Sequence, residues 1–133
     1  MDTRSVVGVG VDGLRQIVSA LEREGISVRG AYLISLTRAD GDKDTAFRIV
    51  TESDPRDVIY KFVRIRRDGL IPSLAEEVRI SPVRPNHIEA ARVLEYAARI
   101  GTPIVTIRNV FWGGIFIEDA VVVKWPNPEH AVA

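Results

Sequence analysis

The sequence predicts a single α+β domain, in which helices pack against an antiparallel sheet. Three segments carry apolar residues at helical spacing, and each ends near a glycine. Short segments rich in strand-forming residues lie between them. The elements follow in the order β-α-β-β-α-β and then α-β-β, and no repeat or linker divides the 133 residues.

Composition excludes several kinds of site and partner. The chain has no cysteine, so disulfides, thiolate metal sites and cysteine nucleophiles are excluded. Its 18 basic and 18 acidic residues balance, whereas proteins held on nucleic acid by phosphate contacts carry a basic excess. No apolar run approaches the roughly 20 residues that span a bilayer, and the first residues lack a signal-peptide pattern. We therefore expect a cytoplasmic protein with neither a membrane nor a nucleic-acid partner.

The amino-terminal segment predicts a strand followed by an amphipathic helix. The strand covers residues 5–11 and the helix residues 12–25. Asp12 is suited to cap the helix, and Gly25 to end it. The buried stripe expected for this helix comprises Leu14, Ile17, Val18 and Leu21.

Two strands come next, over residues 28–38 and 45–52. In the second of them, Phe47 and Ile49 point to one face and Arg48 to the other.

A second helix is predicted over residues 53–69. Ser53 or Asp54 can cap it, and Pro55 suits its first turn, although its middle is rich in strand formers. A short strand over residues 78–83 follows.

Residues 1–83 thus predict a ferredoxin-like β-α-β-β-α-β plan, with both helices on one face of the sheet. Residues 84–133 add a helix and a hairpin, which extend this sheet or cover its open side. The helix covers residues 86–101, and Asn86 and Glu89 have capping-box spacing. Its buried stripe comprises Ala90, Val93, Leu94 and Ala97.

The final strands, over residues 102–112 and 115–125, predict a hairpin that turns at Gly113-Gly114. This register matches apolar residues with apolar ones. It pairs Trp112 with Ile115, Phe111 with Phe116, Val110 with Ile117, Asn109 with Glu118 and Arg108 with Asp119. A turn at Glu118-Asp119 is the competing register, and a ligand loop at the glycines is the functional alternative.

Two short motifs have functional readings beside structural ones. Residues 8–13 match the G-x-G-x-x-G of dinucleotide-binding turns, but no acidic residue follows at the expected distance, which favours a structural turn. His87 and Glu89 match the H-x-E of zinc deaminases, which also require cysteines that are absent here. We therefore expect neither a metal nor a cofactor.

A basic face is predicted on the second helix. Lys61, Arg64 and Arg67 recur at helical spacing and form a candidate anion-binding patch. The structural alternative is a solvated face paired with nearby acids such as Asp57 and Asp68.

Residues 5–36 resemble the first half of an ACT domain, a ferredoxin-like regulatory module, and the likeness continues loosely to residue 83. The matching features are Asp12-Gly13-Leu14, Ala20-Leu21 and Gly25-Ile26-Ser27-Val28. ACT domains commonly bind amino acids at a dimer interface. The resemblance implies a ligand site lined by Asp12, Gly13, Ile26 and Ser27.

We therefore expect a small-molecule-binding regulatory domain that forms a homodimer and is not an enzyme. Amino-acid sensing at the dimer interface is the function that the resemblance implies. One alternative is an enzyme that works through arginines and carboxylates without cysteine or metal. The other is an assembly module that uses the carboxy-terminal hairpin.

Overall fold

The computed structural model describes residues 10–71, 78–101, 105–112 and 114–126. In chain order the elements are α2 (Gly10–Arg23), β1 (Val28–Thr37), β2 (Lys43–Thr51), α3 (Pro55–Arg67), β3 (Val78–Val83), α4 (Ile88–Ile100), β4 (Val105–Trp112) and β5 (Ile115–Lys124). From β1 onward, these bounds lie within two residues of the predicted ends wherever those ends are described. None of the described helices is long and apolar enough to cross a membrane.

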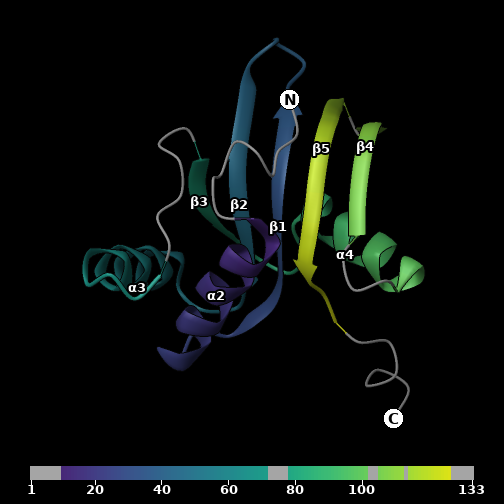
Figure 1. Ribbon diagram of the computed structural model, residues 1–133. Coiled ribbons are helices and arrows are strands. Elements are labelled where there is room, and N and C mark those ends of the chain that lie inside the picture. The colour runs from purple at the N-terminus through teal and green to yellow at the C-terminus, as the bar shows by residue number, and fades with distance from the viewer. Residues whose placement is uncertain (1–9, 72–77, 102–104, 113, 127–133) are drawn as a thin grey trace.

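The five strands form one mixed sheet in the order β3-β2-β1-β5-β4 (Figure 1). β1 pairs antiparallel with β2 and β5, and β4 with β5, whereas β2 and β3 run parallel. The α+β class is confirmed, but the strand order differs from the ferredoxin-like plan. That plan places the first strand between the third and fourth, whereas here β2 and β3 pair directly. Helix α3 supplies the crossover that a neighbouring parallel pair requires.

The amino-terminal helix begins earlier than predicted. Gly10 and Val11, expected in a strand, lie in α2, and residues 5–9 lie outside the described residues. Val11 packs against the core, so the apolar face of the helix extends past the expected start. Asp12 lies in the first turn, where a carboxylate favours the helix dipole, and the capping role predicted for it is wrong. The stop predicted at Gly25 is confirmed by its left-handed φ of 88°.

Helix α3 forms because its start signal and its apolar period outweigh the strand propensity of its residues. The Asp54 side chain accepts the Arg56 N–H at 2.9 Å, and Pro55 occupies the first helical position. The buried side chains recur at helical spacing and are Val58, Phe62 and Ile65.

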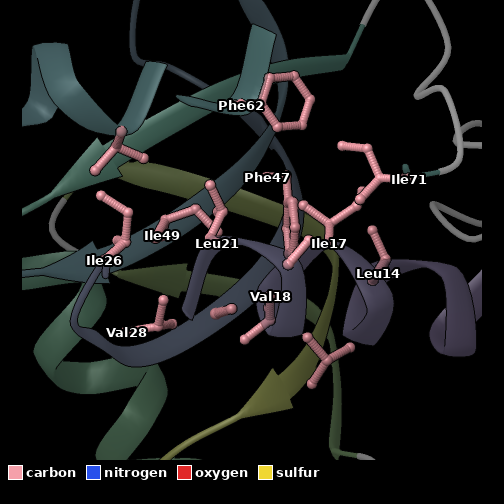
Figure 2. Packing of buried hydrophobic residues seen from close by; sticks show 14 of the residues in the cluster. Leu14, Ile17, Val18, Leu21, Ile26, Val28, Phe47, Ile49, Phe62 and Ile71 are labelled. Carbon is pink, nitrogen blue, oxygen red and sulfur yellow. The ribbon is translucent and has the colours of Figure 1, made fainter. Parts of the chain in front are cut away.

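Helices cover both faces of the sheet. Helices α2 and α3 pack on one face, where their side chains meet those of β1 and β2 (Figure 2). Helix α4 packs on the opposite face through the predicted stripe of Ala90, Val93, Leu94 and Ala97. The sequence left two roles open for the carboxy-terminal segment, and the segment has both: its hairpin extends the sheet, and its helix covers the second face.

The β4–β5 hairpin has the predicted register. Its pairs include Trp112–Ile115, Phe111–Phe116, Val110–Ile117 and Arg108–Asp119. The ring centroids of Phe111 and Phe116 are 4.8 Å apart, and Arg108 Nε lies 3.6 Å from Asp119 Oδ1. Asn109 has a φ of 54°, and its expected pair with Glu118 is not among the ladder pairs of the described residues.

The turn residue Gly114 has a φ of 81°, in the left-handed region that a β-branched residue tolerates poorly. We expect Gly114→Val to lower the free energy of unfolding by about 1–3 kcal/mol through backbone strain. Gly114→Asn is the matched control and should cost less, because asparagine adopts this conformation more readily. Urea unfolding measures both variants, and equal midpoints for Gly114→Val and the wild type would contradict the prediction.

Candidate functional site

A buried polar network lies between the sheet and the amino end of α4. Tyr32, Arg48 and Ser81 form one row across three neighbouring strands, because Arg48 pairs in register with both of the others. Glu89 reaches this row from the first turn of α4. Tyr32 Oη donates to Glu89 Oε1 at 2.6 Å, and Arg48 Nε donates to the same oxygen at 3.0 Å. Arg48 also donates from Nη2 to Glu89 Oε2 at 3.4 Å and from Nη1 to Ser81 Oγ at 2.8 Å.

The charges of this network are stabilised by one another. The side chains of Arg48 and Glu89 are each 7% exposed, so neither charge is well hydrated. Burial opposes the Arg48 charge, but the hydrogen bonds and negative charge of Glu89 outweigh it and raise the pKa of Arg48. Burial, with the negative charge of Glu89, raises the pKa of Tyr32 far above its usual range. The network therefore holds Arg48 as a cation and Tyr32 as a neutral donor.

A pocket of about 540 Å³ adjoins this network, between the amino end of α4 and the start of β5. Its described lining consists of Asn86, His87, Ile88, Glu89, Arg92, Ile115 and Ile117. Glu89 is shared, since its carboxylate belongs to the buried network and its side chain also lines the pocket. The site thus combines an apolar surface with a few polar groups, and hydrogen bonds from Tyr32 and Arg48 fix one of them, the Glu89 carboxylate.

The polar side chains of the pocket differ in the hydrogen bonds that they already make within the protein. Both carboxylate oxygens of Glu89 accept hydrogen bonds from Arg48. His87 caps α4, and its Nδ1 accepts the Ala90 N–H at 3.3 Å, which places the proton of a neutral imidazole on Nε2. Arg92 is exposed and makes no hydrogen bond or ion pair with any residue that the structure describes. Arg92 is therefore the cation of this site that remains available to a ligand.

The capping box predicted for α4 is wrong. His87 rather than Asn86 is the cap, so Glu89 lies one position too early to complete the box. Its carboxylate turns inward because Arg48 lies on the face of the sheet that α4 covers. The strand pattern placed Arg48 on the face opposite Phe47, but it carried no sign that a helix covers that face as well.

The residues implied by the ACT resemblance lie at the two ends of α2. Asp12 is exposed and Gly13 is buried in the first turn, whereas Ile26 and Ser27 follow the last one. A helix of 14 residues is about 20 Å long, so one chain does not bring the two pairs together. Ile26 is buried in the core, and the Ser27 N–H donates to Ser53 Oγ at 3.1 Å.

Asp12 lines a second depression of about 510 Å³ on the outer side of α2. The other described residues around it are Arg15, Gln16, Ser19, Arg23 and Leu70. Its lining is mostly polar and mixes both signs of charge, so it offers a ligand little apolar surface.

The basic residues predicted as an anion patch lie on α3 and each contact an acidic residue. Lys61 Nζ lies 3.3 Å from Asp57 Oδ2, and Arg64 pairs with the Glu24 carboxylate. Arg67 Nε lies 3.6 Å from Asp68 Oδ1. These pairs match the solvated, ion-paired face that was the structural alternative, and anion binding there stays a prediction.

The two short motifs occupy helix starts. Residues 10–13 of the glycine motif lie within α2, and residues 8 and 9 lie outside the described residues. His87 and Glu89 lie at the start of α4, where His87 accepts the Ala90 N–H and Glu89 accepts a hydrogen bond from Arg48. Among the described residues, no three His, Asp or Glu side chains are grouped closely enough to hold a metal ion.

The chain matches no protein-family model, no curated protein and no solved structure.

The ion pair in the network generates a prediction about stability. Arg48→Met leaves the Glu89 carboxylate buried without its counterion, and we expect a loss of about 3–5 kcal/mol. Glu89→Gln keeps an acceptor for Tyr32 and removes the charge, so the double variant should lose less than the sum of the single variants. Urea unfolding of the four proteins completes the cycle, and additive losses would show that the two residues do not interact.

Tyr32 provides a test at alkaline pH. A tyrosine in an unfolded chain ionises near its usual pKa of about 10, whereas the raised pKa keeps folded Tyr32 neutral. The contribution of Tyr32 to stability is therefore fully present below pH 10 and falls as the pH rises above it. We expect Tyr32→Phe to leave the phenolate absorbance step of the folded protein unchanged, because the raised pKa keeps Tyr32 neutral throughout that step. A step that shrinks in this variant would contradict the assignment.

Proposed function

We propose that this domain binds a small molecule in the pocket between the amino end of α4 and the start of β5. The observation that carries the proposal is a concave, largely apolar surface with a few polar residues in its lining, the usual composition of a ligand site. The buried network behind Glu89 supports this reading, because satisfied hydrogen bonds hold the pocket wall in one arrangement. The proposed function is still small-molecule binding, as expected from the sequence. The proposed site lies at α4, whereas the ACT resemblance implied a site at the ends of α2.

A binding role fits this pocket better than the alternative of an arginine–carboxylate enzyme. Such an enzyme would use Arg48 and Glu89, which are the buried pair of opposite charge beside the pocket. Both oxygens of Glu89 are engaged by Arg48, and one also accepts from Tyr32. A carboxylate held in this way supports a wall and is poorly placed to exchange protons with a substrate.

We also propose that the regulatory form is a homodimer, as the sequence and the ACT resemblance predicted. Pro82 lies in the edge strand β3, and Asn109 interrupts the edge strand β4. Both features disfavour pairing between sheet edges. Exposed apolar side chains on α3, Ile59, Tyr60 and Val63, offer the second chain a more suitable surface.

The proposed site can be tested with one pair of matched variants. Ile88 lines the pocket and is 71% exposed, whereas Ile100 is 47% exposed at the other end of α4 and does not line it. We expect Ile88→Trp to obstruct the pocket and Ile100→Trp to leave it open, with little effect of either on folding. A thermal-shift screen of metabolite-sized compounds should find ligands that stabilise the wild type and Ile100→Trp but not Ile88→Trp.

The size of the stabilisation is set by mass action. A ligand at 100 times its dissociation constant adds about 2.7 kcal/mol to the free energy of unfolding. Equal stabilisation of Ile88→Trp would place the ligand elsewhere and overturn the proposed site.

A further inference from the structure

We infer that the ligand of the α4 pocket is an aliphatic carboxylate whose charged group is held by Arg92. This inference rests on the proposed function and names the chemical class of its ligand. Three properties of the pocket support it: the charge that remains available, the side chains of the wall, and the volume.

The available charge of the pocket is positive. Glu89 supplies the acidic group of the described lining, and Arg48 already balances it through two hydrogen bonds from its guanidinium. Arg92 lines the same pocket and has no partner among the described residues. A bound cation would be repelled by Arg92 and would gain no ion pair with Glu89, because Arg48 already neutralises that carboxylate. A bound carboxylate would instead receive charge-assisted hydrogen bonds from the Arg92 guanidinium.

The remaining wall is aliphatic. Ile88 is 71% exposed at the first position of α4, and Ile115 and Ile117 line the pocket from β5. Exposed isoleucine costs free energy in water, and a ligand that covers Ile88 recovers part of it. No aromatic side chain is among the described lining residues, so stacking of a planar ring has no support here.

The volume limits the ligand to metabolite size. A pocket of about 540 Å³ lies within the range of roughly 300–1,000 Å³ that is usual for small-molecule sites. A branched chain of a few carbons with one carboxylate fits this space. The second depression, beside Asp12, lacks this combination because its described lining has one apolar residue, Leu70.

Three probes with the same branched alkyl group separate the contribution of the ligand's charge from that of its alkyl group. They are 4-methylpentanoate, the neutral 4-methylpentanamide and the cationic 4-methylpentylamine. Isothermal titration calorimetry on the wild type should give the tightest binding for the carboxylate. Loss of one charge-assisted hydrogen bond corresponds to about a tenfold change in dissociation constant, so we expect the amide to bind at least about tenfold more weakly.

Arg92→Gln should reduce carboxylate binding by about tenfold and leave amide binding unchanged. Arg99→Gln is the matched control, because it removes the same charge from the exposed last turn of α4, away from the pocket. Equal losses in the two variants would mean that Arg92 acts only through the overall charge of the protein, and would overturn the inference.

The outcomes distinguish this inference from the function on which it rests. If the amide or the amine binds as tightly as the carboxylate, and Ile88→Trp abolishes that binding, the pocket is a ligand site but the carboxylate assignment is wrong. If none of the three probes binds the wild type at millimolar concentration, the aliphatic-carboxylate class is overturned, and the compound screen decides separately whether the pocket binds other ligands.

Discussion

The pair between Arg48 and Glu89 is the constraint on which the arrangement of the second face depends. Two charges removed from water must meet each other with good geometry, or the folded state loses several kcal/mol. Arg48 lies on β2 and Glu89 on α4, so their contact determines where the amino end of the helix rests on the sheet. Tyr32 and Ser81 complete the hydrogen bonds of the pair from the two strands on either side of β2.

Close packing beside this pair positions the rest of α4. A Cβ atom added at Gly30 on β1 would lie 2.6 Å from Leu94 Cδ1, so glycine is what allows the helix to approach the strand this closely. The polar contact holds the amino end of α4, and Leu94 holds its middle. Together they set the distance between the first turn of the helix and the start of β5, which are the two walls of the proposed pocket.

The two faces of the sheet differ in composition, and the difference agrees with the proposed function. The face under α2 and α3 buries an extensive aliphatic and aromatic core (Figure 2). The face under α4 combines an apolar cluster with a buried ion pair and an adjoining pocket. An apolar core supplies stability through the area that it buries, whereas polar groups fixed in a wall supply orientation and specificity for a ligand.

The sequence by itself determined the elements from β1 onward and the hairpin register. The stripe of α4 recurs within one helix, and Phe111 meets Phe116 across a single turn, so residues close along the chain carry both signals. Only the tertiary structure decided that β2 and β3 are neighbours, that a helix covers Arg48, and that Glu89 turns inward to it. Arg48 and Glu89 are 41 positions apart. No local period or turn signal reports a contact over that distance, because it arises from the free energy of burying two charges together.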